Sequence, residues 1–267
     1  MKIHRSLVLS LCFSLQAPLA VAENWDVQAR RCLTLLDQSR DNAEQVCRQA
    51  LGRAEKTGIA DELLANVMNR LGVFYDEKGR FDDAERMYRR SINLKEKVLG
   101  PDSPELAKGI SNLAQLFWSR GWFDYTEPLF RQALAIREKA LGRDHPLVAN
   151  SLNSLGLLYW NQGRHAEAEP LFREALTIRE KHLGADHPDV ATAASNLAVL
   201  CDGAGKPIEA EKLYERALAI REQAFGSKHP LVADSLNNLL LFYRGHGRTQ
   251  EAERLALRLA DISAARR

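Results

Sequence analysis

The stretch HPLVANSLNSLGLLY at residues 145–159 decides the fold, because versions of it recur along the chain at one fixed spacing. Its first two residues return every 42 residues as Ser103-Pro104, His145-Pro146, His187-Pro188 and His229-Pro230. Self-similarity at a period of about 20 to 50 residues is the signature of a repeat array. One unit therefore explains most of the protein.

The unit predicts two helices joined by a short turn. A histidine or serine before proline suits a helix start, since the cap side chain accepts a backbone N–H and proline has none to satisfy. Apolar residues then recur at steps of three and four up to Tyr159, and turn residues follow at 161–164. A second apolar stripe ends at Gly184, where glycine can take the left-handed conformation that closes a helix.

Small and large side chains occupy matching columns of successive units, which lets two helices approach closely and still fill the space between them. The small column of the second helix contains Ala84, Thr126, Ala168, Ala210 and Ala252. Its aromatic column contains Tyr88, Phe130, Phe172 and Tyr214. The small column of the first helix contains Gly72, Ala114, Gly156 and Ala198, with Leu240 breaking the pattern.

These columns resemble the tetratricopeptide repeat, with a longer second helix that gives 42 residues in place of about 34. The likeness is to the kinesin light chain and nephrocystin subclass, carried by residues 145–159 and 167–184. It implies an all-α fold, a right-handed superhelical solenoid of antiparallel helix pairs. The resemblance covers residues 61–265 as five repeats, which start near residues 61, 103, 145, 187 and 229.

A divergent helical hairpin precedes the five repeats at residues 23–60. Residues 41–51 parallel residues 82–92, which places its first helix near 25–40. The chain is therefore expected to form six hairpins in one continuous domain.

The first 22 residues have the pattern of a signal peptide. Lys2 and Arg5 give a positive start, residues 7–15 are apolar, and Ala20-Val21-Ala22 supplies the small residues before a cleavage site. We expect residues 1–22 to be removed and the mature protein to be periplasmic. Retention as a membrane anchor is the weaker alternative, because the apolar stretch is too short to span a bilayer.

The net charge of the mature chain argues against nucleic acid and anionic membranes as partners. Without Lys2 and Arg5 the mature chain has 35 basic and 35 acidic residues. A nucleic-acid or anionic-membrane binder would show a basic excess on one face. The Arg-Glu runs at Arg137, Arg179 and Arg221 are interpreted as a solvated face with weak helical ion pairs.

Two cysteines are candidates for a disulfide. Cys32 and Cys47 lie about equally far on either side of the first turn, and the expected compartment permits disulfides. The alternative is two small buried apolar side chains. Cys201 stands in a core column, which favours a packed, unreactive thiol.

No catalytic, metal-binding or cofactor-binding motif appears, so we expect neither an enzyme nor a metal or cofactor protein. The histidines of the His-Pro pairs sit at equivalent helix starts, which indicates capping. Carboxylates recur once per unit, which indicates a structural face.

The candidate site is a polar surface on the first helices. In the resembling family these helices line a concave groove that holds an extended peptide. One column of this chain contains Asn69, Ser111, Asn153, Ser195 and Asn237, and its neighbour contains Asn112, Ser154, Asn196 and Asn238, with Arg70 as the departure. Asparagine amides both donate and accept hydrogen bonds, so they could pair with a ligand backbone.

Trp118 and Trp160 stand in one later column of adjacent units and could receive an apolar ligand side chain. Two structural alternatives stay open. The asparagines could pair with neighbouring helices, and the tryptophans could fill the space between repeats.

We therefore expect a non-catalytic scaffold of the periplasm that binds a peptide or partner protein. The chain predicts no nucleic-acid partner and no stable membrane insertion after cleavage. The alternative function is binding of glycan or cell-wall fragments, because an asparagine column can also satisfy sugar hydroxyls.

Overall fold

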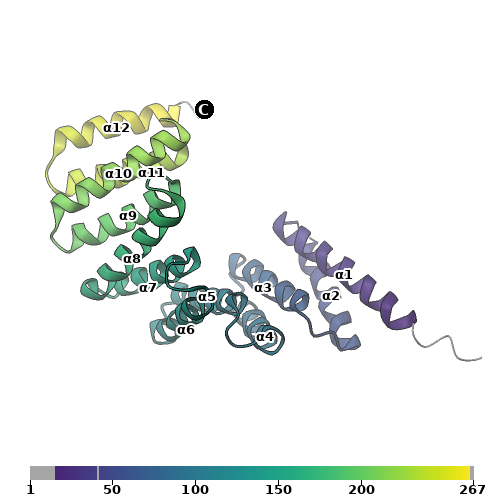
Figure 1. The fold of residues 1–267 in the computed structure, drawn as a ribbon. Coiled ribbons are helices and arrows are strands. Elements are labelled where there is room, and N and C mark those ends of the chain that lie inside the picture. Colours follow the sequence, from purple (N-terminus) through teal and green to yellow (C-terminus); the bar gives the residue numbers. More distant parts are fainter. Residues whose placement is uncertain (1–15, 41, 265–267) are drawn as a thin grey trace, which may run out of the picture. The chain divides into compact units, whose positions relative to one another are not determined.

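The computed structural model describes the backbone of residues 16–40 and 42–264, with side chains from Trp25 onward in this range. Every regular element within the described residues is an α-helix (Figure 1). The helices are α1 (Gln16–Asp37), α2 (Ala43–Thr57), α3 (Glu62–Glu77), α4 (Phe81–Leu99), α5 (Pro104–Ser119), α6 (Phe123–Leu141), α7 (Pro146–Asn161), α8 (His165–Leu183), α9 (Pro188–Gly203), α10 (Pro207–Phe225), α11 (Pro230–Gly245) and α12 (Thr249–Ala264). The predicted all-α repeat solenoid is confirmed.

The chain divides into two compact units, with the boundary inside α5. Unit 1 ends at Leu116, and unit 2 begins at Phe117. Within unit 1, α1 packs on α2 and α3 on α4; within unit 2, α7 packs on α8, α9 on α10 and α11 on α12. The continuity of the array across the two units stays a prediction.

The first helices begin as predicted, with a side chain that caps them. In α7, α9 and α11 the Nδ1 atom of His145, His187 or His229 accepts a backbone N–H two residues later, at 3.1, 3.1 and 3.2 Å. Ser103 caps α5 in the same way, with its Oγ 3.2 Å from the nitrogen of Glu105. These residues satisfy an amide that the helix itself leaves without a partner.

The glycines that end the second helices differ from the expected conformation. Gly184 has φ 87° and ψ 154°, and Gly142 has φ 83° and ψ 156°. The positive φ was expected, but the extended ψ is not that of a left-handed helical residue. This region is open almost only to glycine, and the chain turns there directly into the next first helix.

The small columns do accommodate the aromatic ones. A Cβ atom added to Gly72 would lie 2.7 Å from the ring of Tyr88, and one added to Gly156 would lie 3.0 Å from the ring of Phe172. Both rings are buried. Glycine therefore lets each aromatic ring rest directly on the backbone of its first helix.

A group of side chains that we call the junction cluster joins the second helix of one repeat to the turn of the next. In unit 2, Glu127 accepts from the hydroxyl of Tyr159 at 2.8 Å and from Nη1 of Arg164 at 2.7 Å. The guanidinium carbon of Arg164 lies 3.9 Å from the centre of the Tyr159 ring. Equivalent clusters contain Glu44, Tyr75 and Arg80 in unit 1, and Glu211, Tyr243 and Arg248 in unit 2.

In the repeat that starts near residue 103, Phe117 and Trp122 take the places of the tyrosine and the arginine. Trp122 stands in the arginine column, and its ring centre lies 5.5 Å from that of Phe117. Tyr125, also in contact with Phe117, is 66% exposed. This turn therefore has an aromatic ring where the turns of the other repeats have a basic side chain, and the guanidinium carbon of Arg120 lies 4.8 Å from the centre of the Trp122 ring.

Cys32 and Cys47 form the predicted disulfide, which joins α1 to α2. Cys201 is buried and free, and burial raises the pKa of its thiol to about 11, in agreement with a packed thiol.

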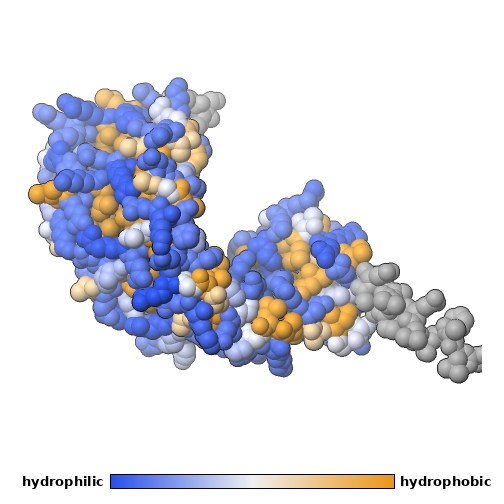
Figure 2. All heavy atoms as spheres, viewed as in Figure 1, coloured by the Kyte–Doolittle hydropathy of each residue, from blue (hydrophilic) through white to orange (hydrophobic). Residues whose placement is uncertain are grey.

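Residues 1–15 of the predicted signal peptide lie outside the described residues. Among the described helices none is long and apolar enough to cross a bilayer. Figure 2 shows a mainly hydrophilic surface with hydrophobic residues in separate groups.

Candidate functional site

The asparagines of the two polar columns meet in pairs between successive first helices. In unit 2, Nδ2 of Asn196 on α9 donates to Oδ1 of Asn153 on α7 at 2.7 Å. In unit 1, Nδ2 of Asn112 on α5 donates to Oδ1 of Asn69 on α3 at 3.1 Å. Asn69 is buried, whereas the other three are partly exposed. Each pair uses one donor and one acceptor, so further hydrogen-bonding capacity remains.

The other members of the columns have different surroundings. Ser111 donates to the carbonyl of Ala107 at 2.9 Å, which occupies its hydroxyl within its own helix. Asn237 is exposed and Asn238 partly exposed, and the part of the chain that the structure describes offers neither amide a hydrogen-bond partner. These two amides at the C-terminal end of unit 2 are available to a ligand.

Trp118 and Trp160 are both partly buried, at the ends of α5 and α7. The ring of Trp118 meets that of Phe130 edge to face, with centres 6.4 Å apart. Each tryptophan lies two helical turns beyond Ser111 or Asn153, so it extends the polar columns along the same side of the helix.

The arginine runs of the second helices contradict the expected solvated face. Arg137 and Arg221 are only 7% and 8% exposed, and Lys95 of the same column is 2% exposed. The glutamates beside them do make surface ion pairs, but between helices instead of within one, as Glu180 on α8 does with Arg216 on α10. The cationic side chains are not solvated because each one extends from its second helix toward the adjoining first helices.

The contacts of the arginines show this direction. Arg179 on α8 donates to Oδ1 of Asn150 on α7 at 3.0 Å and to the carbonyl of Asp189 on α9 at 3.5 Å. Arg221 on α10 donates to the hydroxyls of Thr192 on α9, at 3.2 Å, and Ser235 on α11, at 2.8 Å. Each arginine therefore lies between two successive first helices.

Carboxylates act on three of these cations only from a distance: Glu62 and Glu105 on Lys95, Asp189 on Arg179, and Asp234 on Arg221. Within the described residues none of Lys95, Arg137, Arg179 and Arg221 has a carboxylate oxygen within 4.0 Å, the limit for an ion pair. Burial lowers the pKa of all four side chains. Nε of Arg137 is also buried without a hydrogen-bond partner. Buried cations are usually paired, so this column is an unusual feature of the molecule.

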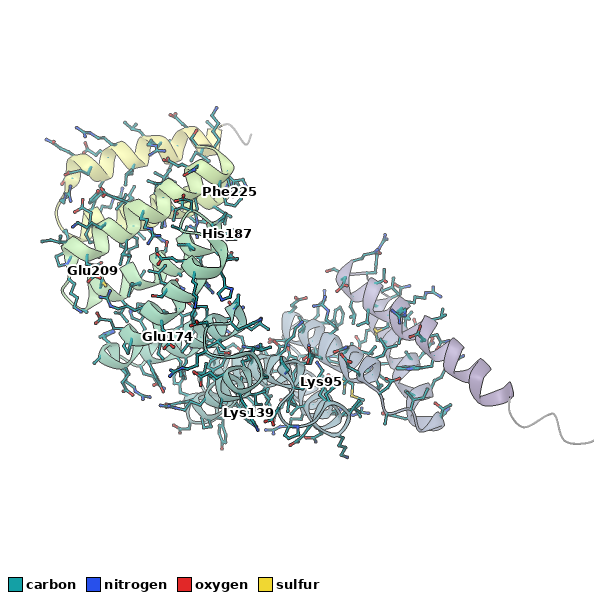
Figure 3. The ribbon with its side chains drawn as sticks, in the orientation of Figure 1. Lys95, Lys139, Glu174, His187, Glu209 and Phe225 are labelled. Atoms are coloured by element: carbon teal, nitrogen blue, oxygen red, sulfur yellow. A yellow bond between two sulfur atoms is a disulfide. The ribbon has the colours of Figure 1, made fainter. Side chains whose placement is uncertain are left out.

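We call the members of the polar columns in unit 2, together with Trp118, Trp160, Arg137, Arg179 and Arg221, the first-helix face. Unit 1 has a pocket of its own, of about 350 Å³, at the equivalent positions. It is lined by Asn69, Lys95 and Lys108 together with other side chains, among them Asp37, Glu62 and Arg70. Figure 3 labels Lys95 among the side chains of unit 1.

The sequence could have pointed to these cations. Lys95, Arg137, Arg179 and Arg221 occupy one column, and a basic residue kept in four successive units differs from a surface position whose charge varies. The signal was missed because the adjacent glutamates suggested helical ion pairs.

No group of three or more histidine, cysteine, aspartate or glutamate side chains in the described residues is arranged to hold a metal ion.

Comparisons with known proteins agree with the repeat geometry. Tetratricopeptide repeat models match residues 64–105, 105–181, 158–223 and 204–265. No curated protein matches the chain.

Three solved structures illustrate the likeness of fold. The TPR-like repeats of a Podosopora anserina kinesin light chain-like protein are 26% identical over 76% of this chain and 96% of that chain, with a TM-score of 0.66. BtubC (BKLC) of P. vanneervenii is 23% identical over 90% of this chain and 91% of its own, with a TM-score of 0.70. PilF of Pseudomonas aeruginosa is 17% identical over 91% and 93%, with a TM-score of 0.63.

The last two structures support the fold alone, whereas the family models span the repeats from α3 to α12. The chain belongs to the tetratricopeptide repeat family, and its structural neighbours include kinesin light chain-like members.

Proposed function

We propose that this protein is a non-catalytic scaffold whose first-helix face binds an extended, carboxylate-bearing segment of a partner protein. The tetratricopeptide repeat fold is generally an interaction scaffold. The observation that supports an acidic segment is the column of buried and half-buried cations, none of which forms an ion pair within the described residues.

A carboxylate from a partner would supply the negatively charged hydrogen-bond acceptor that these cations lack. A buried guanidinium group loses its hydration, and hydroxyl and amide contacts replace only part of it. Arg179 is only partly buried and lies beside the exposed amide of Asn150, so it is the most accessible of the three cations in unit 2. Asp189 and Asp234 belong to the same surface but form no ion pair with Arg179 or Arg221.

Residues 1–22 would direct the protein to the periplasm, as their composition indicates. The Cys32–Cys47 disulfide supports this proposal, because such bonds persist in oxidising compartments. N-terminal sequencing of protein from the periplasm tests it, with Glu23 as the expected first residue.

The binding proposal can be tested with matched peptides. Fluorescence anisotropy would compare labelled extended peptides rich in glutamate with the same peptides carrying glutamine. We expect tighter binding of the glutamate series, weakened by salt. Arg179→Gln should reduce that preference several-fold. The control is Arg173→Gln on the same helix, because Arg173 pairs with Glu169 and Glu209 on the outer surface.

Equal binding of both peptide series, or equal effects of the two variants, would contradict the proposal. Cell-wall glycan fragments form a separate arm, and binding of neutral fragments with no peptide binding would favour the alternative function.

A further inference from the structure

Lys95 of unit 1, which Figure 3 labels, has hydrogen-bond donors that no described residue accepts. Its Nζ atom donates to the carbonyl of Glu105 at 3.3 Å. Arg221 uses the equivalent main-chain acceptor in unit 2, the carbonyl of Leu231 at 3.2 Å. An ammonium group carries three hydrogens, and the described residues accept only one of those of Lys95. The side chain is 2% exposed, so the remaining donors are buried and free.

One acceptor that Arg221 has in unit 2 is absent around Lys95. Arg221 donates to the hydroxyl of Ser235 on the following first helix at 2.8 Å. The position equivalent to Ser235 in unit 1 is Gly109, which has no side chain. A Cβ atom added to Gly109 would lie 3.2 Å from the side chain of Ile92. Glycine therefore lets α5 approach α4 closely and leaves Lys95 without a hydroxyl.

A second acceptor is turned away from Lys95. Arg221 also donates to the hydroxyl of Thr192 at 3.2 Å, and the equivalent position in unit 1 is Asn66. The side-chain nitrogen of Asn66 donates to Glu62 on its own helix at 3.4 Å. Within the described residues no hydrogen bond joins Asn66 to Lys95. Lys95 thus keeps the main-chain acceptor of its column and loses both side-chain acceptors.

Lys95 lines the pocket of about 350 Å³, and all residues around this pocket belong to unit 1. The volume is at the lower end of the range for small-molecule sites. Arg70 and Asp37 in the lining form an ion pair with each other. The other charged side chains of the lining make no ion pair within the described residues; they are Lys95, Lys108, Glu62 and Glu105.

These uncompensated charges are of both signs, and Glu62 and Glu105 act on Lys95 only from a distance. A simple anion would be attracted by the lysines and repelled by the glutamates, and a simple cation would meet the reverse. A small molecule with one carboxylate and one ammonium group satisfies both. We propose that this pocket of unit 1 binds a free α-amino acid, whose carboxylate accepts from Lys95 and whose ammonium group donates to Glu62.

The first test is calorimetric titration of the full chain with the common amino acids, one at a time. We expect at least one of them to bind with a Kd below about 1 mM. Its N-acetyl derivative lacks the ammonium group and its amide derivative lacks the carboxylate, so each should bind at least about tenfold more weakly. Absence of binding by all of them, or undiminished binding of either derivative, would overturn the proposal.

The second test uses variants of the pocket. Lys95→Met removes the ammonium group, and Glu62→Gln removes a carboxylate at an exposed position; each should weaken binding at least about tenfold. Lys97→Met is the matched control, because Lys97 is exposed on the same helix outside the pocket, and it should leave the affinity unchanged. Should Lys95→Met fail to fold, Glu62→Gln and the two derivatives still decide.

The third test restores the missing acceptor. Gly109→Ser places a hydroxyl where Ser235 stands in unit 2, so Lys95 should donate to it and bind the amino acid several-fold more weakly. Gly109→Ala adds the same Cβ atom without a hydroxyl and is its control.

Arg179→Gln, the variant of the peptide experiment in unit 2, should leave amino-acid binding unchanged, so ligand binding at the two units can be lost separately. Equal effects of Lys95→Met and Lys97→Met, or equal affinities of the serine and alanine variants at Gly109, would overturn the proposal.

Discussion

At the scale of single residues, the junction clusters show how one carboxylate can join two repeats. Burial alone would raise the pKa of Glu127, but hydrogen bonds from Arg164, Arg131 and Tyr159 outweigh it and lower that pKa to about 2. The carboxylate is therefore held in its charged form by groups from α6, α7 and the turn before α8.

Glu127→Gln should destabilise unit 2 by about 1.5 to 3 kcal/mol at pH 7, the range for hydrogen bonds to a charged group. The folded pKa lies below the ordinary value of 4.5, so the contribution is full above pH 4.5 and is lost as pH falls toward 2. Urea unfolding at several pH values should show the difference between variant and native chain shrinking over this window.

Glu85→Gln is the control for this change, because Glu85 pairs with Arg89 on its own helix surface and should cost no more than about 0.5 kcal/mol. A constant difference between Glu127→Gln and the native chain from pH 7 to pH 2 would contradict the assignment.

At the scale of helices, the polar columns combine two roles that sequence alone could not separate. Asn153 and Asn196 bind each other, whereas Asn237 has an exposed amide. A column position predicts which helix face a residue occupies, but not whether the neighbouring unit carries a partner at the right distance. The difference between these asparagines provides a direct experiment.

Asn196→Ala should lower the free energy of unfolding by about 0.5 to 1.5 kcal/mol, because Oδ1 of Asn153 loses its donor. Asn237→Ala should change it by no more than about 0.5 kcal/mol, as expected for an exposed position. Thermal unfolding and peptide binding would be measured on both variants. Loss of binding in Asn237→Ala with unchanged stability supports a ligand role, whereas intact binding in both variants would limit the asparagines to joining helices.

At the scale of the whole molecule, repeat period, helix limits and the disulfide could be predicted because they depend on local patterns. Pro146 and the turn at 161–164 mark helix ends, and Cys32 and Cys47 flank a single turn. The burial of Arg137 could not be predicted in this way, since it depends on hydroxyls that the following first helix supplies. The extended ψ of Gly184 depends likewise on the direction in which the next helix departs.

Removing the disulfide should affect the two units unequally. Replacing both Cys32 and Cys47 by serine should destabilise the α1–α2 hairpin by about 3 kcal/mol in the chain-entropy account, for a separation of 15 residues. Hydrogen exchange should detect faster opening in α1 and α2, while α7 to α12 keep their protection, because repeats interact mainly with their neighbours. Uniform loss of protection along the chain would instead indicate that the array unfolds as one cooperative body.

The junction clusters also bear on how arrays of this kind change length by recombination. Glu85, Glu127, Glu169 and Glu211 occupy equivalent positions, and Arg164, Lys206 and Arg248 occupy the positions that follow them one unit later. Suppose that a gene lost the segment that encodes residues 103–144. Glu85 would then precede Arg164 by the same number of residues as Glu127 does now. The excision would remove Trp122 and Tyr125 and leave a basic residue at this position in each remaining turn, as Arg80, Arg164, Lys206 and Arg248. Units of this chain are thus interchangeable, except that duplication of the repeat that starts near residue 103 would add a second aromatic turn to the array.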